Sequence, residues 1–405
     1  MNYERFSRKQ LLTLLWWKQA ELNKYDGLIC DGSVRSGKTV AMSVGCLLWA
    51  MSTFDGCKFA LCGKTIEALR RNVVSLIPGL MDGIMRVQER RSDNTMTVWG
   101  FGHVNTFYLF GGRDESSYTL IQGMTLAGVL FDEVALMPRS FVEQALARCS
   151  ISGSRYWFNC NPEGSSHWFY REWILKAEAH NVLHLHFTMA DNLALDPAVR
   201  ARYETMYTGV FYDRYIRGLW VAAEGLVYPN FDAKKHVIQA LPQDGLYYIS
   251  VDYGTLNPCS MGLWCVNGTE AVRVDEYYWD GRKQQKQKTD EEYYQDLEAL
   301  AGDRVIQDVI VDPSAASFLT TIRHHGRFRA TGADNRVLDG IRYTSTLLSA
   351  GRIKIAEQCK DIQREFASYV WDTKTGKDAV VKENDHAMDD MRYFVMTILA
   401  RYYRW

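Results

Sequence analysis

Short apolar segments alternate with longer helical ones through the first half of the chain. Helical patterns such as Thr65–Ser75 and Ser140–Ala147 separate segments that are apolar or rich in β-branched and aromatic residues. These strand-like segments are Lys58–Cys62, Val104–Phe110, Leu126–Phe131, Tyr156–Phe158 and Val182–Phe187. The alternation, from about residue 27 to 220, predicts a mostly parallel sheet covered by helices.

A phosphate-binding loop opens this region. The apolar Gly27–Cys30 precedes it, an apolar run of helical length, Val40–Met51, follows it, and the octet between them fits G-x-x-x-x-G-K-[ST]. We expect backbone N–H groups and Lys38 to hold phosphate oxygens, and the Thr39 hydroxyl to bind Mg²⁺. A fortuitous glycine-rich turn is the alternative. The predicted nucleotide-binding residues of the octet are Gly32, Ser33, Val34, Arg35, Ser36, Gly37, Lys38 and Thr39.

Polar residues follow two of the predicted strands. Asp132 and Glu133 come directly after Leu126–Phe131, where Asp132 can serve Mg²⁺ and Glu133 can act as the general base for water. Asn159 and Asn161 follow the next strand, where an amide can sense a γ-phosphate and an Asn-Pro turn is equally natural.

A glutamine near the amino end of the chain is a candidate for base recognition. Gln10 stands at the start of a predicted helix rich in Leu and Trp, and its amide can pair with an adenine edge. A surface glutamine at a helix start explains the same position equally well.

The pattern changes after residue 220. Glycine and proline cluster at Gly225, Pro229, Pro242 and Gly245, so we expect a first domain at 1–220, a linker at 221–245 and a second domain at 246–405. The second domain begins with three strands that predict an antiparallel meander, and a helix and a further strand follow. These segments are Tyr247–Gly254, Met261–Val266, Ala271–Tyr278, Asp290–Leu300 and Val305–Asp312.

Three carboxylates in this domain have the layout of an RNase H-like nuclease. Asp252 lies in an apolar strand, Asp312 ends another, and Asp389 shares a helix face with His386 at spacing i, i+3. Carboxylates of this kind hold the two Mg²⁺ or Mn²⁺ ions that assist phosphodiester hydrolysis, and His386 can tune a metal or move protons. A capped turn at Asp312 and a helix-dipole role for Asp389 are the separate alternatives.

Three further acids are second choices for this site. Asp275 and Glu276 lie on the third strand of the meander, and Asp390 points away from the face shared by His386 and Asp389.

Composition narrows the class of protein. The chain has 405 residues, enough for two or three domains, and its net charge of −1 does not mark it as a nucleic-acid binder. No apolar run reaches the length of a membrane span, and nine cysteines without a CxxC pair or an export signal favour reduced thiols in the cytosol. The basic stretch Arg323–Arg342 fits either a phosphate-tracking surface or an ordinary solvated one.

The combination resembles the large terminase subunit of tailed bacteriophages over nearly the whole chain. The most specific segments are Gly32–Thr39, Gly111–Asp114, Asn159–Gly164 and Glu383–Tyr393. The resemblance implies an α/β fold in which a P-loop ATPase domain with a mostly parallel sheet precedes an RNase H-like nuclease domain with a mixed sheet. It implies that ATP hydrolysis drives double-stranded DNA into a procapsid and that a metal-dependent nuclease cuts concatemeric DNA.

The resemblance also implies roles and partners. Arg35 lies where the family often carries an arginine and is a candidate γ-phosphate sensor or cis finger. The adenine-binding motif of the family is only loosely matched at Gln10. The implied partners are a portal ring, a small terminase subunit and further copies in a ring, and the implied location is the host cytoplasm, docked transiently on the procapsid.

Two other functions remain open at this level. One is a DNA translocase or helicase whose second domain only binds DNA or a protein. The other is a docking module with a vestigial phosphate loop, although Lys38, Thr39, Asp132 and Glu133 argue against it.

Overall fold

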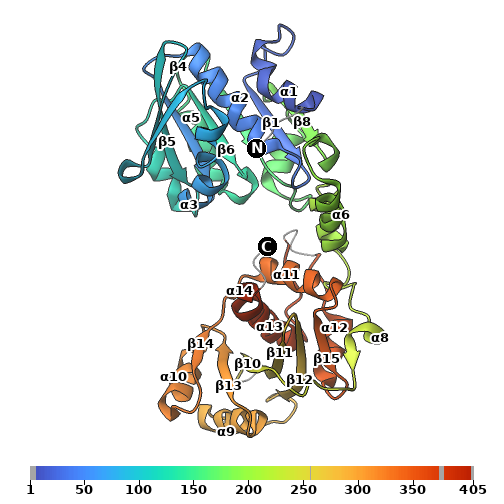
Figure 1. The fold of residues 1–405 in the computed structure, drawn as a ribbon. Coiled ribbons are helices and arrows are strands. Elements are labelled where there is room, and N and C mark those ends of the chain that lie inside the picture. The colour runs from blue at the N-terminus through green and yellow to red at the C-terminus, as the bar shows by residue number, and fades with distance from the viewer. Residues whose placement is uncertain (1–5, 256, 374–377, 403–405) are drawn as a thin grey trace. The chain divides into compact units, whose positions relative to one another are not determined.

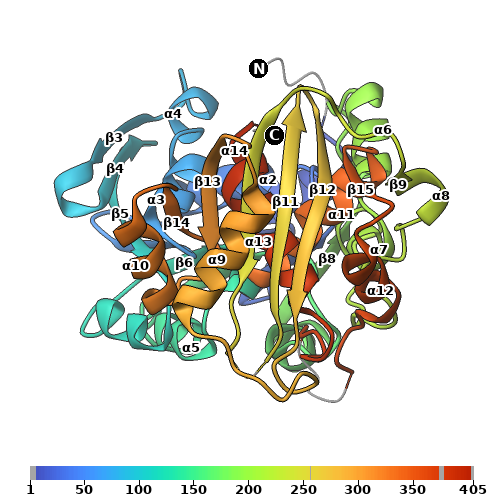
Figure 2. The same ribbon diagram turned by 90° about the horizontal axis from the view of Figure 1, so that it is seen from below.

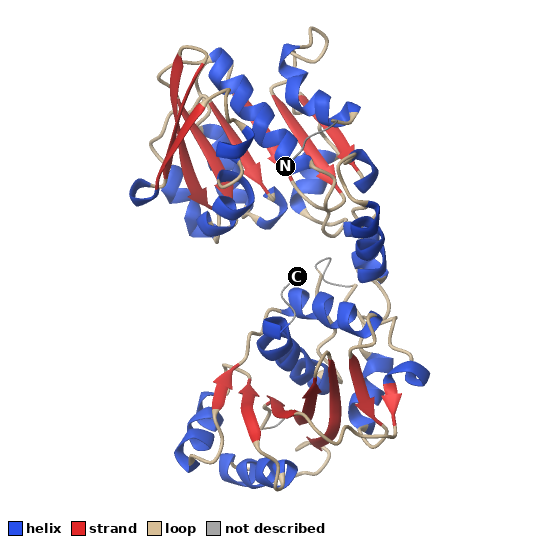
Figure 3. Cartoon of the chain, in the orientation of Figure 1, coloured by secondary structure: helices blue, strands red, loops and turns tan. Residues whose placement is uncertain are grey.

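Two compact units make up the chain in the computed structural model, which describes residues 6–255, 257–373 and 378–402. One unit comprises Met1–Glu204 and Tyr212–Ala222, and the other comprises Thr205–Phe211 and Ala223–Trp405. Each unit is built on a single large sheet with helices against it (Figure 1; Figure 3).

The sheet of the first unit has eight strands in the order β3-β4-β5-β2-β6-β7-β1-β8. From β5 to β8 in this order the strands are mutually parallel, whereas β3 and β4 form an antiparallel hairpin at one edge that the sequence pattern did not predict. The strands are β1 (Gly27–Gly32), β2 (Lys58–Gly63), β3 (Arg86–Arg90), β4 (Thr95–Gly100), β5 (His103–Gly111), β6 (Gly128–Asp132), β7 (Arg155–Asn159) and β8 (Val182–Phe187).

Helices cover both faces of this sheet. On one face α2 (Lys38–Thr53) buries Met42 and Trp49 in a core shared with Trp157 of β7. On the other face α5 (Arg139–Ala147) buries Phe141 and Val142. The remaining helices named here are α1 (Arg8–Leu15), α3 (Ile66–Leu69), α4 (Ile77–Leu80), α6 (Pro197–Met206) and α7 (Gly209–Tyr215).

The sheet of the second unit is mixed, in the order β14-β13-β10-β11-β12-β15-β9. Strands β10, β11 and β12 form the predicted antiparallel meander, and β13 pairs parallel to β10. The RNase H-like fold class predicted from the sequence is confirmed. The strands are β9 (Val237–Ile238), β10 (Leu246–Asp252), β11 (Cys259–Asn267), β12 (Glu270–Trp279), β13 (Ile306–Val311), β14 (Ala330–Gly332) and β15 (Ile353–Ala356).

Alternation along the central strands gives this sheet two apolar faces, and helices pack against it (Figure 2). Leu263 of β11 packs into a core with Tyr293 of α9 (Asp290–Ala301) and Phe318 of α10 (Ala316–His325). Its neighbour Trp264 points to the opposite face, where it stacks on Phe394 of α13 (His386–Phe394). The other helices are α8 (Ala233–His236), α11 (Val337–Ser349), α12 (Lys360–Ser368) and α14 (Ala400–Tyr402).

The basic stretch Arg323–Arg342 lies on a surface where most of its charges are paired. The arginines of the basic stretch mostly pair with acids: Arg327 with Glu298, Arg336 with Asp334, and Arg342 with Asp339. These ion pairs favour the ordinary solvated surface over a phosphate-tracking one.

The nine cysteines are free thiols, and no helix among the described residues is long and apolar enough to cross a membrane.

The contact between α1 and α2 depends on a glycine. A Cβ atom at Gly45 would lie 2.7 Å from the backbone oxygen of Thr13 and 3.2 Å from Trp157. We expect Gly45→Ala to lower the free energy of unfolding by up to about 2 kcal/mol, because overpacking outweighs the helix-propensity gain of about 1 kcal/mol. Urea unfolding followed by tryptophan fluorescence measures it. Ser52→Ala, at an exposed position of the same helix, is the control, and an equal or raised stability of both variants would contradict the expectation.

Candidate functional site

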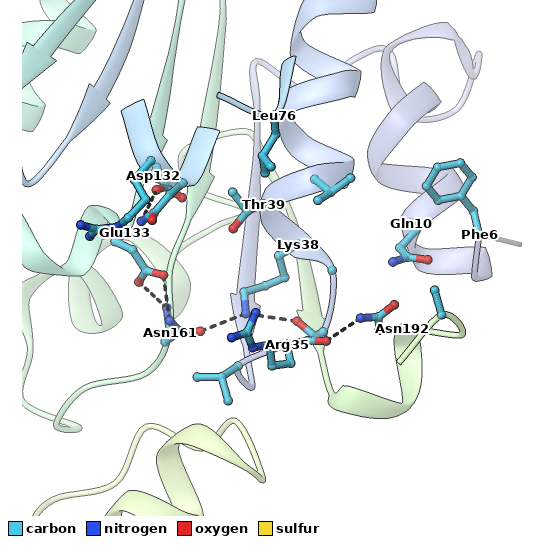
Figure 4. Close-up of a pocket in the computed structure, with 17 residues that line it drawn as sticks. Phe6, Gln10, Arg35, Lys38, Thr39, Leu76, Asp132, Glu133, Asn161 and Asn192 are labelled. Carbon is cyan, nitrogen blue, oxygen red and sulfur yellow. Dashed lines mark hydrogen bonds between the residues drawn. The ribbon is translucent and has the colours of Figure 1, made fainter. Parts of the chain in front are cut away.

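A cavity of about 770 Å³ opens at the carboxyl ends of the parallel strands of the first unit (Figure 4). That volume suits a nucleotide-sized ligand. Strands β1, β6 and β7 are neighbours there, so the phosphate loop and the ends of the other two strands meet at one edge. The lining includes Phe6, Gln10, the loop from Val34 to Thr39, Arg71, Asn72, Asp132, Glu133, Asn161 and Asn192.

The phosphate loop is shaped by glycines that no other residue could replace without strain. Gly32 has φ 127°, and a Cβ there would lie 1.9 Å from the backbone oxygen of Phe187. Gly37 has φ 83°, and a Cβ there would lie 2.3 Å from Nε2 of Gln10. The loop therefore fits closely between β8 and α1 and leads into the amino end of α2, which favours an anion.

Lys38 is buried inside this loop. Its Nζ donates to the backbone oxygens of Gly32 and Ser33 at 3.0 and 2.7 Å, and to Asn161 Oδ1 at 3.1 Å. Burial lowers the pKa of Lys38, and the charge of Glu133 partly opposes that shift. The ammonium thus lies where the phosphates of a bound nucleotide would meet it.

A single amide holds the two predicted Mg²⁺ ligands. Asn159 Nδ2 donates to Thr39 Oγ1 at 2.9 Å and to Asp132 Oδ1 at 2.8 Å, so the hydroxyl and the carboxylate face one place. Asn72 Nδ2 reaches the other oxygen of Asp132 at 3.5 Å. Burial raises the pKa of Asp132. A hydroxyl and a carboxylate oxygen are the donors that Mg²⁺ prefers, and the residues fit the ion.

The contacts of Glu133 orient its carboxylate and suit it to act on a water molecule. Its backbone is left-handed, with φ 59°, which turns the side chain out of the strand direction. Asn161 donates to Glu133 twice, from Nδ2 at 2.8 Å and from the backbone N–H at 3.3 Å. Burial and the neighbouring charge of Asp132 raise the pKa of Glu133 to about 7, which suits a general base. Figure 4 shows Asn161 between Lys38 and Glu133.

Arg35 and Gln10 also line the cavity. Arg35 donates from Nε to the hydroxyl of Tyr203 at 2.8 Å, and its backbone oxygen accepts from Asn192. Gln10 is buried, accepts from the backbone N–H of Ser7, and lines the cavity together with Phe6. The roles of Arg35 in sensing phosphate and of Gln10 in reading adenine stay predictions.

Sequence reasoning missed the support beneath the loop. Asp31, at the end of β1, is contacted by His184 and His186 of β8 and accepts from Trp220 Nε1 at 2.7 Å. Burial would raise the pKa of Asp31, but the hydrogen bonds and charges of the two histidines outweigh it and hold this pKa well below its usual range. Alternating histidines on one strand face, at 184 and 186, were the available signal.

Two of the three predicted carboxylates of the second unit, Asp252 and Asp312, converge on one tyrosine. Asp252 ends β10 and Asp312 follows β13, and Tyr393 Oη donates to Asp312 and lies 3.4 Å from Asp252 Oδ1. His386 Nδ1 contacts the other oxygen of Asp252 at 2.8 Å. Burial raises the pKa of Asp252 to about 6, and the charge of Asp389 adds to the shift. Tyr393 lacked a predicted role, although its spacing of i+7 from His386 places both on one helix face.

Asp389 lies nearby but is paired with cations. Lys382 Nζ lies 2.8 Å from one of its oxygens and Arg392 Nη2 lies 2.9 Å from the other. Among the described residues, no group of three or more His, Cys, Asp or Glu side chains is arranged to hold a metal ion. The carboxylate donors suit Mg²⁺ or Mn²⁺, and an ion would compete with Tyr393, Lys382 and Arg392 for the same oxygens.

The second-choice acids lie elsewhere. Asp390 is fully buried beneath the sheet, bonded to Ser250, Ser260 and Arg273. Glu276 accepts from backbone N–H groups at the start of α12. Among the described contacts, neither Asp390 nor Glu276 bonds to Asp252 or Asp312.

Comparisons with known proteins decide the family. Residues 29–235 match the family model described as "Terminase large subunit, T4likevirus-type, N-terminal". A crystal structure of the large terminase from a thermophilic bacteriophage is 51% identical, covers 98% of this chain and 100% of its own, and superposes with a TM-score of 0.91. The chain belongs to the large terminase family. No curated protein matches it.

Two further structures of that bacteriophage protein contain nucleotides. Its complex with ADP is 51% identical, covers 97% of this chain and 100% of its own, and has a TM-score of 0.88. Its complex with ATP-γ-S is 50% identical, covers 98% and 100%, and has a TM-score of 0.87. The predicted family is confirmed, and with it the function of this terminase as an ATPase and nuclease that packages viral DNA.

The bridge between Lys38 and Glu133 can be tested by removing it. We expect Asn161→Ala to lower kcat for ATP hydrolysis about 10- to 100-fold, because each lost hydrogen bond to a charged group is worth about 1.5–3 kcal/mol. The KM for ATP should change less than about threefold, because the loop still binds the phosphates. A coupled-enzyme ATPase assay measures both constants. Asn23→Ala, an exposed position outside the cavity, is the control, and an unchanged kcat would contradict the role of Asn161.

Proposed function

We propose that this terminase uses ATP, bound in the cavity of the first unit, to move double-stranded DNA into a procapsid, and cuts concatemeric DNA at Asp252 and Asp312 with two divalent ions. The observation that carries the proposal is that each unit brings separate polar residues together at the carboxyl ends of adjacent parallel strands: Asp132 beside Asn159, and Asp252 beside Asp312.

In the first unit, the residues have distinct roles toward ATP. The loop N–H groups and Lys38 hold the phosphates, and Thr39 and Asp132 would hold Mg²⁺, which would supply charge neutralisation for the transferred phosphoryl group. Glu133 accepts the proton of the water that attacks the γ-phosphorus, and ADP leaves with the electron pair of the broken bond. Asn161 orients Glu133, and Arg35 stabilises the transition-state charge after leaving Tyr203.

The base and ribose lie toward α1 in this proposal. Phe6 and Gln10 line that end of the cavity, and Gln10 can present its amide to an adenine edge. Its Oε1 already accepts from Ser7, so the Nε2 donor is the group that reads the base.

In the second unit, Asp252, Asp312 and Asp389 would hold the divalent ions, which would supply charge stabilisation for phosphodiester hydrolysis. His386 contacts Asp252 and can take or give a proton beside it. Tyr393 holds Asp252 and Asp312 together by its hydroxyl.

The packaging partners follow from family membership. They are a portal ring, a small terminase subunit and other copies of the chain in a ring on the procapsid, within the host cytoplasm.

The pairing of Asp389 with Lys382 and Arg392 favours one competing function, a translocase whose second domain only binds DNA or protein. Wild-type protein that cleaves no plasmid under any divalent ion would support that alternative.

The ATPase assignment predicts a selective loss in Glu133→Gln. The amide keeps the shape of the side chain but cannot take a proton, so we expect ATP hydrolysis to fall at least about 100-fold. Nucleotide affinity, measured with a fluorescent ADP analogue, should stay within about threefold, because the loop is intact. Mn²⁺-dependent plasmid cleavage should persist. Hydrolysis at the wild-type rate would remove Glu133 from the mechanism.

The nuclease assignment predicts the opposite loss in Asp252→Ala. Removing this carboxylate deletes a metal ligand, so cleavage of supercoiled plasmid in Mn²⁺ should disappear on an agarose gel while ATP hydrolysis survives. The matched control is Asp275→Asn, an acid of the same sheet that bonds only its neighbour's backbone N–H among the described contacts. Cleavage that survives in Asp252→Ala would refute the site.

A further inference from the structure

Three buried acids and an arginine lie beneath the proposed nuclease site without facing it. Arg273, Glu365 and Asp390 have no exposed surface, and the Glu276 side chain is 6% exposed. Burying charges in this way is costly unless each is paired and hydrogen-bonded. We therefore ask what structural role these four buried charges have in addition to any contribution to stability.

The first part of the group joins β12 to α12. Arg273 Nε lies 3.2 Å from Glu276 Oε2 on the same strand. Glu276 accepts from the backbone N–H groups of Asp361 and Ile362 at 2.6 and 3.3 Å, in the first turn of α12. This carboxylate therefore satisfies N–H groups that the helix itself leaves unpaired, and its charge suits the positive end of the helix.

The second part repeats the device from α12 to α13. Glu365 of α12 accepts from the backbone N–H groups of Ala387 and Met388 at 2.7 and 3.3 Å, in the first turn of α13. Its other oxygen accepts from Tyr278 Oη of β12 at 2.8 Å. The amino end of α13 is the turn that carries His386.

The third part closes the circuit from α13 back to β12. Asp390 pairs with the Arg273 guanidinium, with Nη2 at 3.0 Å from Oδ2, and accepts from Ser250 Oγ at 2.9 Å. Space for the guanidinium depends on Gly262 of β11, where a Cβ would lie 2.2 Å from Arg273 Nη1. In one helix turn of α13, Asp390 is thus fixed to the sheet while the adjacent Asp389 points in a different direction and pairs with Lys382.

We propose that Arg273, Glu276, Glu365 and Asp390 form a closed circuit of buried anchors that positions α13, so that His386 and Asp389 meet Asp252 at the metal site. The inference rests on the proposed nuclease function. These four are positioning residues, because among the described residues none of their hydrogen bonds or ion pairs reaches Asp252, Asp312 or Asp389. Glu276 and Asp390, second choices as metal ligands on sequence grounds, support the ligands instead.

The decisive comparison is Glu365→Leu against Glu365→Gln in the full chain. Leucine removes both acceptor atoms at similar size, whereas glutamine keeps an oxygen that can accept from Ala387 and Met388. We expect the half-saturating Mn²⁺ concentration for plasmid cleavage to rise at least about tenfold in the leucine variant and to stay within about threefold in the glutamine variant. ATP hydrolysis should be unchanged in both. Glu357→Leu, an exposed glutamate just before α12, is the control.

A metal-free readout accompanies the activity assay. Hydrogen–deuterium exchange should be faster at the first turn of α13 in the leucine variant only, because its N–H groups lose their acceptor. Unchanged Mn²⁺ dependence and unchanged exchange in a folded Glu365→Leu protein would overturn the proposal. Equal losses in the glutamine and leucine variants would also overturn it, because the acceptor atoms would then not be what matters.

Two outcomes need separate treatment. If Glu365→Leu does not fold, Asp390→Asn carries the test, because it keeps side-chain volume and removes the charge opposite Arg273. The same rise in Mn²⁺ requirement is expected, and its absence would overturn the circuit. Wild-type protein without plasmid cleavage would instead refute the nuclease function, and exchange at α13 would still decide whether the anchors hold the helix.

Discussion

The parallel pairing of neighbouring strands is the constraint on which both sites depend. Strands that run the same way end at the same edge, so residues that follow them come together however far apart they lie in the chain. In the first sheet, the pairing of Asp132 with Asn159 puts both beside the loop that follows β1. In the second, Val251 is in register with Val311, and the next residues are Asp252 and Asp312. Once the sheet is formed, a few polar residues at the ends of neighbouring strands are therefore enough to assemble each site.

This constraint explains how much of the molecule could be predicted from its sequence. Asp132, Glu133, Asp252 and Asp312 were found because each follows or ends an apolar strand, and the strand's direction in the sheet then fixes its neighbours. The antiparallel edge strands β3 and β4 were missed. Strand β3 is exposed or half-buried along its whole length, so it lacks the apolar run by which the other strands are recognised, and β4 is joined to β5 by a short turn at Phe101 and Gly102.

The contacts that complete the sites could not be predicted in this way. Asn72, Asn192 and Tyr203 approach the cavity from segments that share no motif with the phosphate loop, and only tertiary packing brings them there. Lys382 reaches Asp389 from the segment before α13, outside any helical periodicity. The different directions of Asp389 and Asp390, in contrast, could be predicted from the sequence. Successive helix positions differ by about 100° in direction, so one acid faces the site and the other faces the sheet.

The two sites differ in how their acids are satisfied, and the difference has a physical consequence. Asp132 and Glu133 are held by the neutral amides of Asn159 and Asn161, which orient the carboxylates without cancelling their charge. Asp389 is held by Lys382 and Arg392, which cancel it. Among the described residues, Asp132 and Glu133 have no direct ion pair, although Lys38 lies nearby, whereas a cation entering the second site must displace Lys382 and Arg392 from Asp389. Breaking these ion pairs costs free energy, so a cation that binds Asp389 meets a penalty that a cation at Asp132 does not. The buried contacts of Glu365 and Asp390 attach α13 to α12 and to β12 through other groups than Lys382 and Arg392, so the position of the helix and the charge balance of Asp389 rest on separate interactions.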